Sequence, residues 1–325
     1  MIRFGLCCLF RQAPIAFRRT TARYLSRLDP AAARRHLAGL CRRNAEGLHQ
    51  ALAFCRRNGI GAFRINSQIL PLKTHPEFAY DLRDLPGGRE IEGLFRDAGR
   101  YARDHGIRTS FHPDQFILLS SPDQSVVDRS LADLVYQTEV AEWVGADVIT
   151  IHAGGVYGDK SAALGRLAAR VEHLPRAVRT RLTLENDDRS YTPADLLPVC
   201  RGLGLPLVYD VHHHRCLPDG LDEAAATGQA LSTWNREPLF HLSSPANGWG
   251  KGDPRPHHDY IDPRDVPACW QDLQVTVEVE AKAKELAVAK LMGELGIGND
   301  VRRPALGPET CAPPPDPGPE ALGKR

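Results

Sequence analysis

One aspartate and three histidines follow a short apolar run in the middle of the chain. The run, residues 207–209, is a Leu-Val-Tyr triplet behind a Gly-Leu-Pro break, and it has the composition of a short buried strand. Asp210 is the first charged residue after it, and His212, His213 and His214 follow closely. Imidazole nitrogen and carboxylate oxygen are ligands that zinc, manganese and iron take from proteins. We therefore predict a metal site at the end of this strand, because a histidine run without a function, such as an affinity tag, belongs at a flexible terminus.

The same arrangement, an apolar run that ends in an imidazole or a carboxylate, recurs along the chain. The residues at the ends of the third to eighth predicted strands are His112, His152, Glu185, Asp210 with His213, His241 and Glu280. A single histidine at a strand end is more often a structural residue, and Glu280 could be an acid in the first turn of a helix. Their coincidence at successive strand ends indicates a shared site instead. This set exceeds what one ion can use, so we expect two or three divalent ions.

Short apolar runs and amphipathic stretches alternate through most of the sequence. We predict strands at residues 1–10, 60–65, 107–111, 147–151, 181–184, 206–209, 238–241 and 275–279. Helices are predicted at residues 30–58, 89–105, 125–144, 161–174, 193–201, 221–234 and 280–292. Such alternation implies right-handed crossovers and a parallel sheet, and eight strand–helix units are the number that closes a barrel. The predicted fold class is therefore α/β, a single (β/α)8 TIM barrel, whose strand ends meet at the face where barrel active sites lie.

The last part of the chain differs in composition from the rest. From about residue 298 it turns to proline, glycine and charge, with prolines at 313–315, 317 and 319. Such a segment cannot bury enough apolar surface to fold. Within a length of 325 residues, which suits one large α/β barrel, we predict a barrel domain over residues 1–297 and a disordered tail over residues 298–325.

Charge is spread unevenly along a chain whose formal net charge is only +1. Residues 1–110 carry 20 Lys+Arg against 9 Asp+Glu, which leaves 21 against 31 for the remainder. The basic first third, with arginine pairs such as Arg18-Arg19 and Arg56-Arg57, could follow a polyanion. The same pairs could equally be solvated helix faces.

Cysteine usage and apolar runs bear on the compartment. The eight cysteines form no CxxC pair and most lie in predicted strands or helices, so we expect buried thiols in a reducing compartment. The apolar stretch of residues 1–10 precedes most nearby arginines, which is the reverse of a signal peptide. No apolar run approaches the roughly 20 residues of a membrane span. These features favour a cytoplasmic protein without membrane association, and no obligate protein partner is evident.

Seven motifs, taken in order, resemble the UV damage endonuclease family. They lie at residues 112–116 (His-Pro-Asp-Gln-Phe), 151–160 (Ile-His-Ala-Gly-Gly-Val-Tyr-Gly-Asp-Lys), 184–188 (Leu-Glu-Asn-Asp-Asp), 210–214 (Asp-Val-His-His-His), 241–244 (His-Leu-Ser-Ser), 257–261 (His-His-Asp-Tyr-Ile) and 280–282 (Glu-Ala-Lys). The resemblance spans about residues 2–292. It implies a xylose-isomerase-like TIM-barrel nuclease that uses a cluster of divalent ions, typically manganese, to nick duplex DNA on the 5′ side of ultraviolet photoproducts. Zinc is the other ion that these ligand types would accept.

The resemblance also implies the residues of the metal site. The implied ligands are His75, His112, His152, Glu185, Asp210, His213, His241, His257 and Glu280. Glu185 and His241 would be catalytic as metal-site residues, and Lys160 is a further catalytic candidate. A phosphodiester is a poor, negatively charged electrophile, so its hydrolysis needs an activated water, charge neutralisation and stabilisation of the leaving oxygen. A cluster of ions can supply all three.

Damaged double-stranded DNA is the partner that the resemblance implies. Gln115 and Phe116 would lie against the damaged bases, because an amide can pair with a base edge and a ring can stack on a displaced base. Tyr157 and Lys160 would lie near the backbone. A photodimer already weakens stacking, so opening the duplex there costs less than elsewhere and gives lesion selectivity without sequence readout.

Three positions depart from the family pattern. Family members usually carry a lysine, modified to a carbamate that bridges metals, two residues before the strand-seven histidine, and this chain has Leu239 there. In the first loop the family often has a lesion-probing tyrosine and asparagine, where this chain has Leu6 and Phe10. The sequence thus leaves open a smaller or differently bridged cluster and a different lesion preference.

Two other functions stay open at this point. A sugar isomerase or epimerase on the same barrel would use two metals and a few acids to move a proton next to a carbonyl, and fold alone cannot separate it from a nuclease. A damage-binding protein could keep the barrel without turnover. The basic first third and the pair Gln115-Phe116 favour nucleic acid over sugar, and a pure binder would not need all nine ligand positions.

Overall fold

Eight parallel strands form the centre of the structure, a computed structural model that describes residues 1–297. The strands are β1 (Ile2–Cys7), β2 (Ala62–Ile65), β3 (Arg108–Phe111), β4 (Val148–His152), β5 (Leu182–Glu185), β6 (Leu207–Val208), β7 (Leu239–Leu242) and β8 (Val275–Val279). All eight fall at predicted strands, β1 being shorter than expected. The predicted tail, residues 298–325, lies outside the described residues.

The strands close into a barrel. Their order is β6-β5-β4-β3-β2-β1-β8-β7, so chain neighbours are also neighbours in the sheet. Between β6 and β7 the ring is closed by a backbone hydrogen bond of 3.0 Å, which His241 donates to Tyr209, and by a bridge between Asp210 and His241. The predicted (β/α)8 barrel is therefore confirmed.

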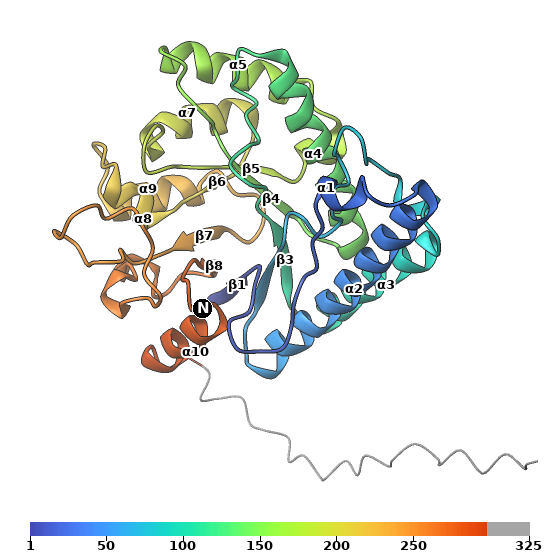
Figure 1. Ribbon diagram of the computed structural model, residues 1–325. Coiled ribbons are helices and arrows are strands. Elements are labelled where there is room, and N and C mark those ends of the chain that lie inside the picture. The colour runs from blue at the N-terminus through green and yellow to red at the C-terminus, as the bar shows by residue number, and fades with distance from the viewer. Residues whose placement is uncertain (298–325) are drawn as a thin grey trace, which may run out of the picture.

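Helices surround the sheet on its outer face (Figure 1). They are α1 (Ala22–Leu25), α2 (Pro30–Arg57), α3 (Gly88–Asp104), α4 (Gln124–Val144), α5 (Lys160–Glu172), α6 (Arg176–Arg179), α7 (Pro193–Leu203), α8 (Val211–Cys216), α9 (Glu223–Leu231) and α10 (Glu285–Glu294), with short 3-10 turns η1 (Leu82–Asp84), η2 (Pro263–Asp265) and η3 (Ala268–Trp270). Several begin behind an aspartate whose carboxylate accepts a hydrogen bond from a first-turn N–H. These caps are Asp29 on α2, Asp123 on α4, Asp159 on α5 and Asp222 on α9. Such caps satisfy backbone donors that have no partner inside the helix and so set where each helix begins.

Alternation along the strands gives the sheet an apolar outer face and, towards the carboxyl end, a polar inner one. On β5, Leu184 joins the core beneath the helices, whereas Thr183 and Glu185 point into the barrel. On β8, Glu278 also points inward, and Gly5 of β1 leaves room for it, since a Cβ there would lie 3.1 Å from the Glu278 Cγ. The barrel interior can therefore hold charged groups at its carboxyl end.

An apolar cluster fills the other end of the barrel interior. Val148, Val208 and Leu239 are fully buried and pack together, with Trp234 against them. Leu239 lies two residues before His241 on β7, so both side chains point inward, one level apart. Leu239 thus belongs to the floor beneath the barrel mouth.

The structure differs from the prediction at three places. The last helix, predicted from residue 280, begins at Glu285, because the preceding residues turn and Lys284 has a φ of 53°. The three histidines after Asp210 lie in the short helix α8, which Asp210 caps, and not in an extended strand end. Most cysteines among residues 1–297 are buried or half-buried, but Cys269 is exposed. Every helix within this range is too short or too polar to span a membrane.

Candidate metal centre

Glu185 ends β5 and lies, fully buried, in the mouth of the barrel. Its Oε2 is 2.6 Å from Nε2 of His112, and its Oε1 is 2.8 Å from Nδ1 of His241. His152 and His213 approach the same carboxylate, with ring nitrogens 3.7 and 3.4 Å from its oxygens. Burial alone would raise the pKa of Glu185, but His241 and the other imidazoles hold it well below its usual value. Glu185 is therefore an ionised carboxylate surrounded by imidazoles.

Candidate ligand atoms fall into three overlapping groups at this mouth. The groups are His112, His152 and Glu185; His112, His241 and Glu280; and Glu185, Asp210 and His213, with the ligand atoms of each group within 4.8 Å of one another. Two donors that each bind one ion at about 2.0–2.2 Å lie about 3 to 3.5 Å apart, which resembles the separations around Glu185. Because Glu185 and His112 belong to two groups each, the arrangement suits more than one ion.

Two buried polar atoms at the mouth have no hydrogen-bond partner among the described residues. They are Oδ2 of Asp210 and Nδ1 of His152. Asp210 uses its other oxygen to accept a 2.7 Å bond from the backbone N–H of His213, which starts α8. Burial lowers the pKa of His152, so its imidazole stays neutral and able to bind a cation. Nδ1 of His213 lies 3.6 Å from this oxygen, too far for a hydrogen bond. A buried carboxylate oxygen without a hydrogen bond is well suited to bind a cation, so this donor set fits divalent ions.

Asn186 ties the ends of β5 and β6 together directly behind these ligands. Its side-chain oxygen accepts a 3.0 Å bond from the Asp210 N–H, and its Nδ2 donates a 2.9 Å bond to the Asp210 carbonyl. Asn186, the residue after Glu185, thereby fixes the position of the Asp210 backbone. Metal sites depend on such supporting contacts to orient their ligands before an ion arrives.

Beneath the cluster lies an ion pair that the sequence prediction did not include. Arg64 of β2 is 7% exposed, and its Nε and Nη1 lie 2.5 and 2.6 Å from Glu278 and Glu280. Its Nη2 is 2.8 Å from Nε2 of His241, and Ser110 donates a hydrogen bond to Glu278. Burial would raise the pKa of both carboxyls, but Arg64 lowers that of Glu278 to about 2 and that of Glu280 well below its usual value. The sequence does contain a signal for this pair, because Arg64 and Glu278 are each the one charged residue within an apolar strand.

A family model described as UV-endonuclease UvdE matches residues 2–307. The chain belongs to the UV-endonuclease UvdE family. A UV DNA damage endonuclease of Bacillus velezensis is 34% identical, over 94% of this chain and 98% of the relative. A second, from Bacillus pumilus, is 34% identical over 85% of this chain and 87% of its own length. The family resemblance seen in the motifs is thus confirmed.

Solved structures agree with the UvdE assignment. The crystal structure of SacUVDE has a TM-score of 0.81 and 25% identity, covering 91% of this chain and 99% of that one. Endonuclease IV from Thermus thermophilus has a TM-score of 0.56 at 15% identity, covering 90% of this chain and 99% of the other. D-psicose 3-epimerase from Clostridium cellulolyticum has a TM-score of 0.53 at 13% identity, covering 86% and 84%. At such low identity, the last two show a shared barrel and nothing about activity.

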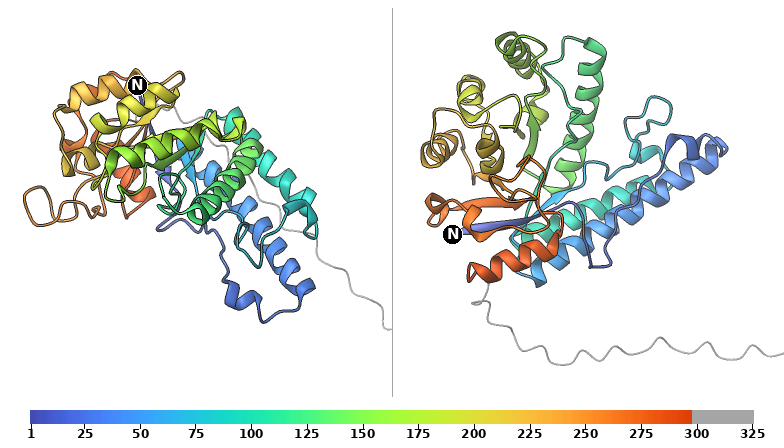
Figure 2. Two further views of the ribbon diagram at one scale, coloured as in Figure 1. Left: turned by 90° about the horizontal axis from the view of Figure 1, so that it is seen from above. Right: turned by 60° about the vertical axis from the view of Figure 1, so that its left-hand side comes forward.

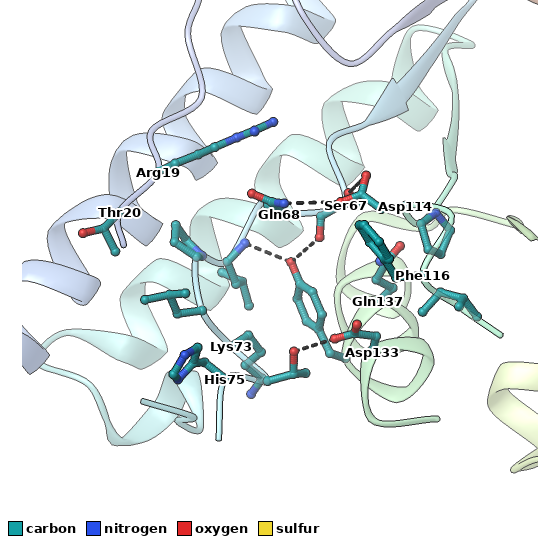
Figure 3. Close-up of a pocket in the computed structure, with 17 residues that line it drawn as sticks. Arg19, Thr20, Ser67, Gln68, Lys73, His75, Asp114, Phe116, Asp133 and Gln137 are labelled. Atoms are coloured by element: carbon teal, nitrogen blue, oxygen red, sulfur yellow. Dashed lines mark hydrogen bonds between the residues drawn. The ribbon is translucent and has the colours of Figure 1, made fainter. Parts of the chain in front are cut away.

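The two other ligands that the family resemblance implies, His75 and His257, lie outside the three groups. His257 is beside them, with Nδ1 3.7 Å from Oε2 of Glu280 and 3.4 Å from the Ser243 hydroxyl. His75 lines a separate recess of about 330 Å³, where its ring packs against Phe78. Figure 3 shows His75 and Phe116 on opposite sides of that recess. The structure therefore brings His257 near the cluster but not His75, whose role as a ligand stays a prediction.

Residues expected to touch DNA lie on the loops after β3 and β4. Gln115 is exposed, and Phe116 is 72% exposed at the edge of the recess in Figure 3. Tyr157 is 43% exposed, has a φ of 50° and receives the Arg166 guanidinium over its ring at 5.8 Å. Lys160 starts α5 and pairs with Asp195 at 2.8 Å. The first three side chains are free to meet a ligand, whereas Lys160 is already held by a carboxylate.

The positions that depart from the UvdE pattern lie away from the mouth. Leu239 is in the apolar floor and cannot bind an ion. Leu6 is fully buried in the core, and Phe10 packs on Phe54 and Phe63, with ring centroids 5.2 and 6.0 Å away. Leu6 thus lies within β1 and not in a loop, and neither side chain is directed to the metal ligands.

Proposed function

We propose that this chain is a metal-dependent DNA repair endonuclease that nicks duplex DNA on the 5′ side of ultraviolet photoproducts or related lesions. The observation that carries the proposal is the set of three overlapping ligand groups around Glu185 in a member of the UvdE family. The relatives from Bacillus velezensis and Bacillus pumilus carry the name UV DNA damage endonuclease, which supports the same activity here. The catalytic unit would be the barrel of residues 1–297.

The proposed cofactor is a pair or trio of divalent ions, with manganese as the first candidate. The residues that would hold them are the members of the three groups, His112, His152, Glu185, Asp210, His213, His241 and Glu280, with His257 beside them. Bound ions would neutralise the phosphodiester and polarise it for attack by water. Leu239 leaves the cluster without the lysine of the family, so Glu185, which belongs to two groups, would be the residue that helps to hold more than one ion.

The chain's own residues would position the substrate around this centre. Phe116 would stack on a base displaced at the lesion, because its ring is exposed on the loop after β3. Gln115, beside it, would test the edge of a base through its amide. Arg64, buried below the ligands, would hold Glu280 and His241 in place through the contacts described above.

Nicking of a defined lesion tests the proposal directly. A duplex with one photoproduct, labelled at the end of the damaged strand, is incubated with the purified protein with and without manganese. We expect one cut on the 5′ side of the photoproduct, a 3′-hydroxyl that a polymerase can extend, and no cut in the presence of chelator. Elemental analysis after reconstitution with manganese or zinc should find at least two ions per chain. A ratio of one or less would contradict the multinuclear centre.

The same assay separates the alternatives. Turnover of a keto or aldose sugar, with no cut in damaged DNA, would favour an isomerase or epimerase on the shared barrel. Tight binding of the photoproduct duplex without cleavage under manganese or zinc would favour a damage-binding protein. Equal nicking of damaged and undamaged plasmid would retain the nuclease but contradict the lesion specificity.

A further inference from the structure

The long loop between β7 and β8 lies across the barrel mouth from the expected lesion contacts. In a closed ring of eight strands in chain order, β7 stands opposite β3, and the metal ligands lie between them. Figure 1 shows the loop, in orange, projecting on one side of the barrel, while α1 and the segment after β2 project on the other. The left view of Figure 2 shows the same separation. A ligand that spans the mouth and touches Phe116 on one side would therefore meet this loop on the other side.

The tip of the loop presents one aromatic and one cationic side chain. Its base is held by backbone hydrogen bonds from Ala246 to Pro256, 2.7 Å, and from His258 to Ser244, 2.7 Å. Trp249 and Lys251 alternate at the tip with three glycines whose φ values are 78°, 77° and 74°. Such positive φ values are strained for residues with a Cβ, so the glycines let the chain turn sharply around the two side chains. Both side chains are exposed.

Trp249 is anchored although it is exposed. Its Nε1 donates a 2.8 Å hydrogen bond to Asp265, and its ring lies 5.3 Å from the His212 ring and 5.8 Å from the Arg215 guanidinium. The side chain nevertheless remains 39% exposed. A large ring that is fixed in place and accessible loses little conformational entropy on binding, so it is well suited to stack on a base.

A cleft of about 1060 Å³ runs beside this tip. It is lined by polar, aromatic and charged side chains that include Trp249, Lys251, Tyr260, Arg264 and the carboxylates Asp262 and Asp265. Asp265 pairs with Arg215 at 3.4 Å. Arg264 pairs with Asp262 at 2.5 Å, and Lys290 at the edge pairs with Glu294. Among residues 1–297, Lys251 has no ion-pair partner. The cleft therefore offers one uncompensated positive charge next to a fixed aromatic ring, which together match a phosphate and its neighbouring base.

An endonuclease cuts inside a strand, so nucleotides continue on both sides of the bond that breaks. We propose that Trp249 and Lys251, with the cleft beside them, bind the DNA flank on the opposite side of the scissile phosphate from the bases that Phe116 contacts. Lys251 contacts a backbone phosphate, and the Trp249 ring takes a base or sugar of that flank. The inference rests on the proposed endonuclease function and adds a second DNA-binding surface to it.

Three variants and one control test this surface. Lys251→Glu reverses the unpaired charge, Trp249→Ala removes the ring, and Trp249→Phe keeps a ring but removes the hydrogen bond to Asp265. The matched control is Arg176→Glu, which makes the same change of charge at an exposed position of α6, the short helix that precedes β5 and so lies at the other end of the barrel. KM and kcat are measured with manganese on an end-labelled duplex that contains one thymine dimer, and thermal unfolding checks that each variant folds.

We expect Lys251→Glu to raise KM about tenfold, with a smaller change in kcat, and to reduce the slope of log affinity against log salt by about one. Trp249→Ala should raise KM by about tenfold, whereas Trp249→Phe should retain most of the affinity. Arg176→Glu should behave as the unmodified protein. Equal losses in Trp249→Phe and Trp249→Ala would mean that the Asp265 hydrogen bond, not the ring, is what matters, and would overturn the proposed stacking.

Duplexes with one arm shortened locate the contact. The KM penalty of Lys251→Glu should disappear when the arm on one side of the lesion is removed and persist when the other arm is removed. If the KM penalty persists in each of the two shortened duplexes, the assignment of Lys251 to one flank is overturned. If the unmodified protein nicks the duplex and Lys251→Glu matches it in KM and salt dependence, the inference fails while the proposed function stands. If the unmodified protein cuts no damaged DNA, the proposed function fails and the inference fails with it.

Discussion

The interior of the barrel mouth and its rim differ in how firmly their side chains are held. In the interior, Glu185, His241 and Arg64 are buried and each contacts two or more charged or imidazole partners. On the rim, Phe116 is 72% exposed and Gln115 is exposed as well. The interior groups that would carry out the chemistry are thus fixed before a substrate binds. The rim side chains that would recognise it become ordered only on binding.

Backbone strain follows the same division. The non-glycine residues of the described chain with positive φ are Cys8, Leu72, Tyr157 and Lys284, and all four lie in loops that follow strands at the carboxyl face. Such conformations cost on the order of 1–3 kcal/mol each and persist where the surroundings determine them. The rim thus carries strain that the regular barrel beneath it does not, as is common near functional sites.

Removal of the charge at Glu185 should produce the largest effect. Glu185→Gln keeps the shape of the side chain but removes the negative charge that would hold ions. We expect nicking to fall by on the order of 10³-fold or more, with fewer ions bound per chain. Thermal unfolding of the metal-free protein should change little, because the amide oxygen still accepts a hydrogen bond. A comparable loss of metal-free stability would assign Glu185 to the fold and not to the chemistry.

Removal of the buried cation beneath the site should chiefly affect folding. Arg64→Met leaves the buried Glu278 and the half-buried Glu280 without this counter-charge, so we expect the free energy of unfolding to fall by about 3–5 kcal/mol. Denaturant unfolding of the metal-free protein measures this. Arg42→Met, which breaks a solvent-exposed pair with Glu90, is the control and should have little effect. If both variants lose the same stability, the interior is not held more firmly than the surface.

The pKa of Glu278 predicts a pH dependence of stability. Burial would raise this pKa, but Arg64 lowers it to about 2 in the folded protein, below its value in the unfolded chain. The stabilisation is therefore present above about pH 4.5 and is lost as the pH falls towards 2, by about 3 kcal/mol in all. Unfolding free energies of the metal-free protein measured across this window test it. Glu278→Gln should flatten that part of the profile, and an unchanged profile would contradict the pairing.

Loss of the exposed Phe116 ring on the rim should have the smallest effect. It should change only the selectivity for damaged over undamaged DNA. We expect Phe116→Ala to reduce the preference for photoproduct over undamaged duplex about tenfold, since stacking on one base is lost. Stability should not change, because the side chain is mostly exposed. Phe116→Tyr keeps a ring and should retain the preference. Nicking rates on paired damaged and undamaged substrates measure the ratio, and a loss of rate on both alike would make Phe116 part of the chemistry.

Much of the site could be predicted because its information is local in the sequence. A short strand has its ligand at or next to its carboxyl end, as Glu185 ends residues 182–185 and His241 is the last residue but one of 239–242. Parallel closure brings such ends together whatever lies between them. The apolar runs therefore determined the barrel, and the residues after them determined most of the ligand set. The motif at residues 112–116 likewise located the exposed Phe116 on the rim.

The tertiary structure alone decided which groups meet across the barrel. Arg64 and Glu278 lie 214 positions apart, and their pairing follows from the register of β1 with β2 and β8, which no local pattern encodes. The same holds for Leu239, whose place in the apolar floor depends on Val148 and Val208 from other strands. His75 is a ligand that the family resemblance implies, but it lies on a long loop, and its distance from the cluster depends on how that loop packs. Strand ends are positioned by hydrogen bonds to their neighbours, whereas loops and interior charges are positioned by contacts that exist only once the barrel has closed.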